Sequence, residues 1–567
     1  MIFHTKSNTK LDPQTNPEFY QFIQDLLEYV VTLHIALDEV MHEFFGLAMD
    51  DEFIPDFIPD FIDLSNIGVI LPEFFLGLSV LFLILHCILL VSNKKKKYPI
   101  IQKSVIKLCI LILIFTFYLI SNNNYLLELS VFNSTLINDY MSISAKQCIL
   151  LSSIIFFMLI PVYLNDQKIN SFEYNILILF SVLGLLVICS ANDLITLYLG
   201  IEIQSLSFYL LAAYKKNSIF STEAGLKYFI LGSFSSGLFL FGASFIYGST
   251  GSTNFNDFKD LFFYITPENS LNLDTIFLDF NLLHLGVLIL LISLFFKLAL
   301  APFHIWSPDV YEGSLTSSTA FFAIIPKIGI FLALVKFFHF NFYYLFLDDW
   351  RIYFIIISVL SIIIGSFTGL EQRKVKSLLA YSSISHMGYS LLAFSIGTFD
   401  GLIVLFFYLI VYLMSGLCVW AIFLSVKLKK NYLKKSNIDL SDFSSLVKSN
   451  TTLAILFATV VLSIAGFPPL IGFYAKMGVF LVTIESTSYI IALVGILCSV
   501  VSSFFYIRLV KVLFFEKRVA GNLYYPINYT NSLIMSICFV LLIVLFLKPT
   551  LLYLFCYRMC LTGIFCI

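Results

Sequence analysis

The twelve residues FFKLALAPFHIW (295–306) place a charged residue and a helix breaker inside one apolar run. Lys297 precedes Pro302 by five residues. Both are costly in a helix that crosses a lipid bilayer, because a charge has to leave water and a proline lacks the N–H that continues the helix. A hydrophobic segment that keeps both predicts a broken helix, either buried in protein or beside a hydrated cavity.

Apolar segments of this kind recur along most of the chain. The 567 residues are 59% hydrophobic and 12% charged, whereas an ordinary globular domain has about 25% charged residues. Runs of about 20 apolar residues recur between residues 69 and 550, and each is long enough to cross a ~30 Å hydrocarbon core. Because backbone groups in lipid must hydrogen-bond to one another, such runs predict helices. We expect an all-α polytopic membrane protein without strands.

The loops between these runs differ regularly in charge. Lys and Arg are concentrated after spans 1, 3, 5, 9, 11 and 13, and the intervening loops are poor in them. Such enrichment marks the cytoplasmic or matrix side, so both ends of the chain are expected on the opposite side. One loop departs from this rule, since it contains Asp309 and Glu312 and no basic residue. The roughly 14 predicted spans are 69–91, 103–121, 147–164, 173–190, 193–213, 224–247, 281–306, 315–338, 352–370, 376–396, 401–426, 452–482, 487–513 and 530–552.

Two further parts flank the predicted transmembrane domain, which covers residues 69–552. Residues 1–68 form an acidic extension, with an amphipathic helical pattern followed by the Pro-rich linker DEFIPDFIPDFIDL (51–64). This extension lacks the Arg-rich, acid-poor composition of a mitochondrial transit peptide. We expect it to pack on a neighbouring subunit. Residues 553–567 are expected to form a short C-terminal tail.

Ionisable residues inside the predicted spans are the strongest functional signal. Each costs at least ~2.5–3.5 kcal/mol at the centre of a spanning helix. Burial disfavours the charged form of a lysine and a nearby carboxylate favours it, so such groups are suited to a proton relay with water between them. The five residues are Glu202, Lys227, Lys297, Lys327 and Lys476.

Each of these residues also has a purely structural interpretation. A lysine near a span end can extend to the membrane surface, which applies most to Lys227 and then to Lys476. Glu202 can belong to a structural ion pair. His304 and His386 lie near helix ends or breaks and could extend the relay, although a single histidine is more often a hydrogen-bonded structural residue.

A second stretch repeats the combination of proline and lysine. Pro468 and Pro469 interrupt span 12, and Lys476 follows them by seven residues. Spans 7 and 12 are five spans apart, so they cross the membrane in opposite directions. Broken helices in equivalent places of two halves are typical of an inverted repeat. We therefore expect two five-helix repeats, spans 4–8 and 9–13.

The chain lacks the motifs of a redox enzyme. Its ten cysteines are scattered singly, without a CxxC pair beside histidine, and no flavin or nicotinamide fingerprint is present. The net charge of −2 gives no indication of nucleic-acid binding. We expect no cofactor and no metal in this chain.

Four stretches carry a resemblance to a known family: 197–242 (LYLGIEIQSLSFYLL…), 295–314 (FFKLALAPFHIWSPDVYEGS), 373–394 (RKVKSLLAYSSISHMGYSLLAF) and 463–480 (SIAGFPPLIGFYAKMGVF). In order, and over about residues 69–550, they resemble NADH–ubiquinone oxidoreductase chain 2 of respiratory complex I. The segment SPDVYEGS (307–314) distinguishes it from the related chains 4 and 5. Residues 1–68 depart from the family pattern.

The resemblance implies an antiporter-like proton-translocating subunit, coupled to quinone reduction elsewhere in the enzyme complex. The family's glutamate and lysines of spans 5, 6, 7, 8 and 12 match Glu202, Lys227, Lys297, Lys327 and Lys476. It implies other membrane-arm subunits and lipids as partners. Abundant Phe, Ile, Lys and Asn favour the mitochondrial inner membrane over a bacterial plasma membrane. The alternatives are a stand-alone cation/proton antiporter, a structural subunit without translocation, and a proton-coupled solute carrier.

Overall fold

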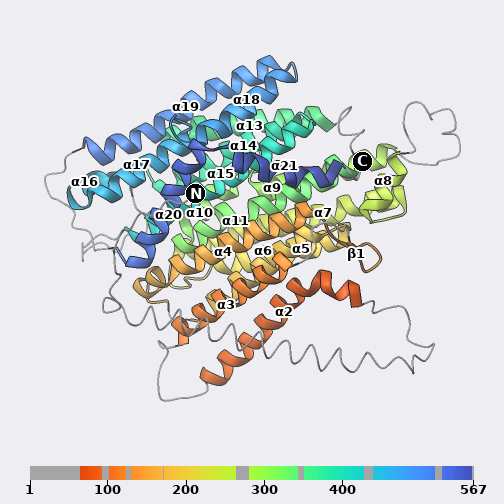
Figure 1. Ribbon diagram of the computed structural model, residues 1–567, viewed down its shortest axis with the longest axis horizontal. Helices are drawn as coiled ribbons and strands as arrows, with labels where there is room; N and C mark the ends of the chain where they lie inside the picture. Colours follow the sequence, from red (N-terminus) through yellow and green to blue (C-terminus); the bar gives the residue numbers. More distant parts are fainter. Residues whose placement is uncertain are drawn as a thin grey trace, which may run out of the picture. The chain divides into compact units, whose positions relative to one another are not determined.

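The computed structural model describes residues 64–91, 101–122, 129–169, 171–263, 280–342, 350–426, 439–516 and 527–564. These residues form a bundle of long helices (Figure 1). Twelve of the described helices are long and apolar enough to cross a membrane. The expected all-α polytopic fold is thereby confirmed, whereas the count of 14 spans stays a prediction. Apart from the start of the first described helix at Leu64, the acidic extension lies outside the described residues.

Three N-terminal helices and a small hairpin come first. Helix α3 packs on both α2 and α4, and strands β1 and β2 pair antiparallel, with Leu129 opposite Asn138. The expectation of no strands is therefore wrong. The hairpin lies between apolar runs, where its polar turn has positive φ at Phe132, Asn133 and Ser134. The elements are α2 (Leu64–Val91), α3 (Ile101–Asn122), β1 (Leu129–Val131), β2 (Leu136–Asn138) and α4 (Tyr140–Asp166).

Two sets of helices follow, and equivalent helices in the two sets pack against equivalent partners within their own set. In the first set α5 packs on α6 and α11, and in the second α13 packs on α14 and α19. Likewise α7 packs on α9, and α15 packs on α17 and α18. This equivalence is what the predicted repeat requires. The first set is α5 (Glu173–Ser190), α6 (Leu194–Ala212), α7 (Ile219–Thr250), α8 (Phe255–Phe263), α9 (Phe280–Leu298), α10 (Trp306–Gly313) and α11 (Thr316–Leu334). The second is α13 (Arg351–Glu371), α14 (Val375–Ser395), α15 (Phe399–Ser425), η4 (Leu440–Ser445), α16 (Leu446–Ser449), α17 (Thr451–Ala465), α18 (Ile471–Glu485) and α19 (Tyr489–Phe514).

Both predicted breaks are present. Helix α9 ends at Leu298 and the short α10 begins at Trp306, so Pro302 lies in the non-helical connection. Helix α17 ends at Ala465 and α18 begins at Ile471, with Pro468 and Pro469 between them. The expectation that spans 7 and 12 are broken is confirmed.

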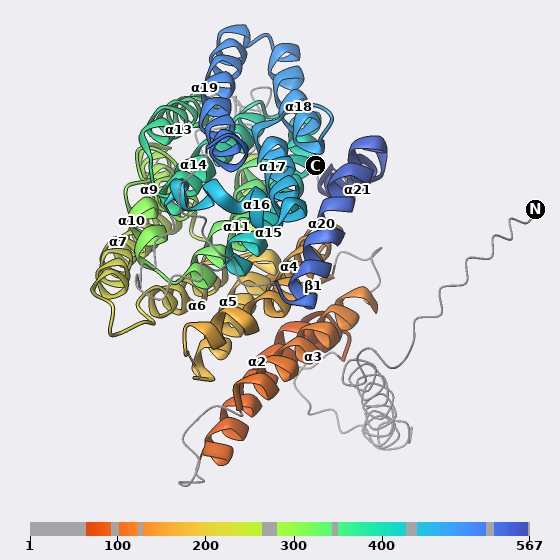
Figure 2. The ribbon, with the colours of Figure 1, turned by 90° about the vertical axis from the view of Figure 1, so that its left-hand side faces the viewer.

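Helix α11 is the most enclosed element of the bundle. All its residues are buried, and it packs on α4, α5, α6, α9 and α15. Figure 2 shows α11 and α15 in the middle of the bundle, with other helices around them. Helix α11 continues into a π-helical segment, η2 (Val335–Asn341). Charged side chains on α11 are therefore surrounded by protein rather than by lipid.

Two helices close the chain, α20 (Tyr529–Leu547) and α21 (Thr550–Ile564). Helix α21 packs on α4 and α15. The segment expected to be a tail after residue 552 is thus helical as far as Ile564. Its sequence, TLLYLFCYRMCLTGI, is apolar enough to bury one side against those helices.

Candidate functional site

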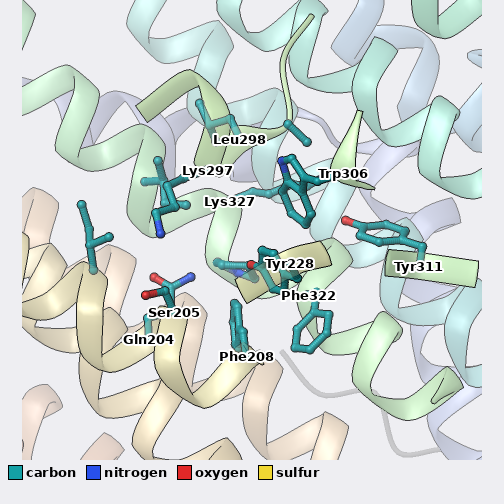
Figure 3. Close-up of a pocket in the computed structure, with 14 residues that line it drawn as sticks. Gln204, Ser205, Phe208, Tyr228, Lys297, Leu298, Trp306, Tyr311, Phe322 and Lys327 are labelled. Atoms are coloured by element: carbon teal, nitrogen blue, oxygen red, sulfur yellow. The ribbon is translucent and has the colours of Figure 1, made fainter. Parts of the chain in front are cut away.

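Lys297 and Lys327 line one small cavity in the first repeat. Lys297, in the last turn of α9, points toward Gln204 and Ser205 of α6 (Figure 3). Lys327 reaches the same cavity from α11. The cavity has a volume of ≈ 20 Å³, which is room for about one water molecule. Two lysines from different helices therefore lie on either side of a water-sized space.

Glu202 lies on α6 between Ile201 and Ser205, which both line this cavity. Ser205 Oγ donates a hydrogen bond to Glu202 Oε2 at 3.4 Å, and Ser205 itself lines the cavity. Lys297 Nζ is 3.5 Å from Tyr209 Oη, at the limit of a hydrogen bond. The carboxylate of Glu202 thus reaches the cavity through Ser205, whereas Lys297 lines the cavity directly.

The end of α9 is closed by groups of the connection that follows it. Ala299 adopts a φ of 58°, which turns the chain out of the helix, and the N–H of Leu300 donates to the carbonyl of Phe295 at 3.0 Å. Trp306 Nε1 donates to the carbonyl of Phe296 at 3.0 Å. The Trp306 ring also stacks on Tyr228, with centroids 4.6 Å apart. These bonds satisfy carbonyls that the break leaves without an intrahelical partner.

A tyrosine of the second repeat holds Lys327. Lys327 Nζ donates to Tyr412 Oη at 3.1 Å, and that hydroxyl donates in turn to the carbonyl of Ala323 at 3.1 Å. The ammonium also lies 4.8 Å from the centre of the Tyr412 ring, a cation–π distance. Lys327 is only 5% exposed. The central lysine is therefore positioned by a neutral hydroxyl and a ring face.

His386 of α14 lies close to the same tyrosine. Its ring centre is 5.5 Å from that of Tyr412. Its Nδ1 is hydrogen-bonded to Tyr408 Oη at 2.6 Å and its Nε2 to Tyr506 Oη at 3.1 Å. Both ring nitrogens thus face phenol hydroxyls, which can either donate or accept.

Lys476 lines a second cavity with these residues. Its Nζ donates to the carbonyl of Ala465 at 2.6 Å, across the break between α17 and α18. This cavity of ≈ 20 Å³ is lined by Lys476, His386, Tyr408 and Tyr412, among others. Because Tyr412 also bonds Lys327, it joins the two cavities. The polar groups form an interrupted line from the partly exposed Glu202 to the buried Lys476.

Lys227 and His304 are not part of this line. Lys227 Nζ lies 2.9 Å from Glu223 and 2.8 Å from Asp309, and its side chain is 45% exposed. Its partners in the structure are thus Glu223 and Asp309 rather than Glu202. His304 lies in the connection after α9 and lines neither cavity.

These contacts also account for the loop that departed from the charge rule. Lys227 neutralises Asp309 there. Glu312 is paired with Lys374, which directly precedes α14 in the second repeat. The basic partners come from other parts of the chain and are therefore invisible in the loop's own sequence.

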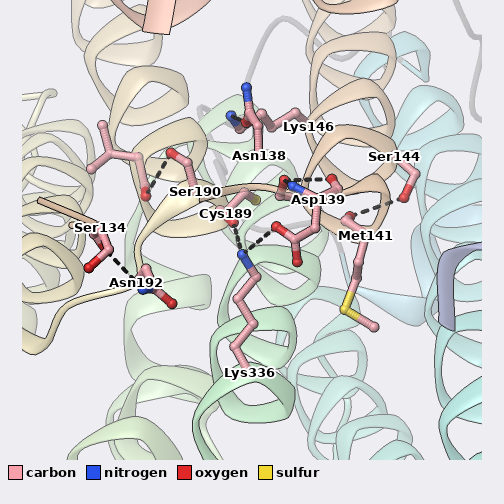
Figure 4. A network of polar contacts seen from close by, with 12 residues as sticks. Ser134, Asn138, Asp139, Met141, Ser144, Lys146, Cys189, Ser190, Asn192 and Lys336 are labelled. Atoms are coloured by element: carbon pink, nitrogen blue, oxygen red, sulfur yellow. Dashed lines mark hydrogen bonds and ion pairs between the residues drawn. The ribbon is translucent and has the colours of Figure 1, made fainter. Parts of the chain in front are cut away.

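Sequence reasoning missed a second buried cluster of charges. Lys146 Nζ lies 2.5 Å from Glu73 Oε1. Figure 4 shows the second pair, in which Lys336 Nζ lies 3.2 Å from Asp139 Oδ1. Glu73 and Lys336 are within predicted spans 69–91 and 315–338, close to the span ends. The available signal was that both positions are charged in apolar runs. In the part of the chain that the structure describes, no group of three or more His, Cys, Asp or Glu side chains could hold a metal ion.

Comparison with known proteins decides the family. Residues 191–502 match the family described as NADH:quinone oxidoreductase/Mrp antiporter, TM. The chain is 38% identical to NADH-ubiquinone oxidoreductase chain 2 of Marchantia polymorpha, over 86% of this chain and 97% of that one. The chain belongs to the chain 2 family of NADH:ubiquinone oxidoreductase. The subunit N proteins of NADH-quinone oxidoreductase are bacterial relatives, and that of Pelagibacter ubique is 38% identical over 80% of this chain and 91% of its own length.

Solved structures agree with membership of the chain 2 family. A chain of respiratory complex I from Thermus thermophilus with bound aureothin superposes with a TM-score of 0.69 at 26% identity, covering 85% of this chain and 98% of that chain. A chain of the Mrp complex from Dietzia sp. DQ12-45-1b gives a TM-score of 0.71 at 16% identity, covering 88% and 97%. The second likeness concerns the fold alone.

Proposed function

We propose that this chain is a proton-translocating subunit of the membrane arm of respiratory complex I, driven by quinone reduction elsewhere in the complex. One observation carries the proposal. Lys297 and Lys327 share a water-sized cavity, and Tyr412 links Lys327 to a second cavity lined by His386 and Lys476. Membership of the chain 2 family supports the same function.

Each side chain has a role that follows from its surroundings. Glu202 is the counter-charge that draws a proton toward Lys297, by way of Ser205. Lys327 is the central relay, because it faces the first cavity and bonds the tyrosine that lines the second. His386, between two phenols, extends the path toward Lys476. Lys476 is the connecting or exit-side group.

Coupling has to change the proton affinity of these lysines. Moving one charge against 100 mV costs about 2.3 kcal/mol. Removal of a counter-charge, or entry of water into a dry cavity, changes the free energy of a buried ammonium by a comparable amount. The breaks beside Lys297 and Lys476 provide the space in which the side chains change position.

Charged residues on the surface of α7 and α10 indicate where partner subunits bind. Lys227, Glu223 and Asp309 are about half exposed on α7 and α10, next to exposed apolar residues such as Phe229. Charges in a lipid-facing surface are costly, so we place other membrane-arm subunits, including adjacent antiporter-like ones, beside this face. We assign the chain to the mitochondrial inner membrane. A bacterial plasma membrane is the alternative, since relatives include bacterial subunit N proteins.

Lys327→Arg and Lys327→Met in the intact complex test the function. Arginine keeps the positive charge but does not release its proton, and methionine removes both. We expect both variants to assemble and both to lose proton pumping into proteoliposomes, with NADH:quinone reductase activity lowered by about tenfold or more. Assembly is checked on native gels. If either variant pumps protons at the full rate, Lys327 is not a relay and the proposed path is wrong.

A further inference from the structure

Lys336 continues the line of buried lysines beyond Lys327. It lies nine residues further along the same helical rod, in the π-helical segment η2, which places it about 13 Å from Lys327 along the axis. It is 6% exposed. π-Helical turns occur frequently at functional sites. By the charge pattern of the loops, this end of the rod faces the side opposite the basic loops.

The amine of Lys336 is held by one carboxylate and one carbonyl. Lys336 Nζ lies 3.2 Å from Asp139 Oδ1 and donates to the carbonyl of Cys189 at 3.0 Å (Figure 4). Asp139 is the N-cap residue of α4, and Cys189 lies in the last turn of α5. This environment differs from that of Lys327, whose partner is a neutral phenol.

A large polar cavity opens beside this pair. Its volume is ≈ 370 Å³, far more than the water-sized spaces around Lys297 and Lys476. Asp139 and Lys336 line it together with Asn192, Lys259 and Asp260. A space of this size with charged and amide walls holds several waters. The amine of Lys336 therefore lies between the enclosed centre of the bundle and a cavity with room for several waters.

A neighbouring ion pair, Glu73–Lys146, holds the segment that carries Asp139 in place. Lys146 Nζ lies 2.5 Å from Glu73 Oε1 and donates to Asn138 Oδ1 at 2.7 Å. Asn138 directly precedes Asp139, and its amide donates to the carbonyl of Val69. Lys146 is nearly inaccessible and does not line the cavity. The Glu73–Lys146 pair thus holds the segment that presents Asp139.

We propose that Lys336, paired with Asp139, is the proton-release group on the side opposite the basic loops. The inference rests on the proposed function. An N–H bond of the Lys336 ammonium breaks as its proton passes to water in the cavity. The neutral amine then takes up the proton given up by the ammonium of Lys327. Direct transfer needs heavy atoms within hydrogen-bond reach, so water must enter transiently between the two lysines. The carboxylate of Asp139, 3.2 Å from Lys336 Nζ, attracts the incoming proton by its negative charge.

Charge-conserving substitutions separate this role from a structural one. Lys336→Arg keeps an ion pair with Asp139 but does not release a proton, and Lys146→Arg makes the same change in the neighbouring pair. Protons pumped per NADH and reductase activity are measured with the purified complex in proteoliposomes, after assembly is checked on native gels. We expect Lys336→Arg to lower pumping by about tenfold or more, and Lys146→Arg to pump as the wild type does.

Every other outcome overturns the proposal. Full proton pumping by Lys336→Arg means that the Lys336–Asp139 pair is structural. An equal loss of pumping in Lys146→Arg means that the cluster is sensitive to any change in side-chain size. If Lys336→Arg does not assemble, Lys336→Gln is used, and failure of both to assemble assigns the lysine to packing. Lys327→Arg is measured in parallel. If it blocks pumping while Lys336→Arg does not, the release group is wrong and the proposed function stands.

Discussion

The two broken helices look alike in sequence but are closed in different ways. After α9, the carbonyl of Phe296 accepts from the indole of Trp306 and also from the N–H of Ala299. Lys297 reaches the hydroxyl of Tyr209 at 3.5 Å. After α17, Lys476 itself donates to the carbonyl of Ala465 at 2.6 Å. At the first break, Trp306 closes the helix end and Lys297 is the titratable group. At the second break, the single side chain of Lys476 has both roles. The lysine near the proline therefore has a different structural role in each repeat.

Lys476→Met gives the largest effect expected from this difference. It leaves the buried carbonyl of Ala465 without its donor, which costs about 1–3 kcal/mol, and it removes the titratable group. We expect less assembled complex after a fixed heat step on native gels, together with lost pumping. Lys297→Met is the matched variant, because it loses pumping but keeps heat stability. Equal heat sensitivity of both variants would show that the two breaks depend on their lysines in the same way.

Gly466→Ala tests how closely Lys476 is held at the second break. Gly466 has a φ of +86°, and an added Cβ would lie 2.8 Å from Lys476 Cδ. The backbone conformation alone costs an L-residue about 1–2 kcal/mol. Gly251→Ala is the control, because Gly251 has a φ of +76° with nothing within 4 Å of an added Cβ. We expect both to lower heat stability, and only Gly466→Ala to impair proton pumping. Normal pumping in Gly466→Ala would mean that Lys476 tolerates displacement.

Trp306→Phe is the mildest change and concerns the first break. It removes the Nε1 donor to Phe296 while keeping a ring against Tyr228, so we expect a loss of about 1 kcal/mol. Pumping should persist, because Lys297 keeps its own contacts. Heat stability and proton pumping of the purified complex are measured, with Tyr228→Phe as a control that preserves the ring stack. Complete loss of pumping would contradict the separation of roles at this break.

The features best predicted from the sequence are those that are energetically costly in a lipid bilayer. The breaks at Pro302 and Pro468 are predictable because proline disrupts the hydrogen bonds of a helix. Proline does not end every helix that contains it, since three helices stay continuous around Pro72, Pro161 and Pro326. Lys327 is conspicuous within a long apolar span. Lys227 was harder, because its partner Asp309 is 82 residues away and lies in a loop that seemed to need a basic residue of its own.

The residues that were not predicted have no distinctive pattern in the sequence around them. Tyr412, Tyr408 and Tyr506 are three of 31 tyrosines, and a phenol in an apolar run usually indicates packing rather than a relay. Only tertiary contacts bring these hydroxyls to Lys327 and His386. Lys336 lies near a span end, where an exposed lysine is the ordinary expectation, and its partners Asp139 and Cys189 are distant in the sequence.

The lining of the two central cavities bears on which ions can pass. A metal cation enters a narrow path only if oxygen ligands replace its water shell. Among the described residues that line these cavities there is no carboxylate, while Lys297, Lys327 and Lys476 are present. Ammonium groups repel a cation and offer it no lone pair, yet they take up and release a proton. The lysines that we propose as relay groups would therefore also disfavour the entry of sodium or potassium into these cavities.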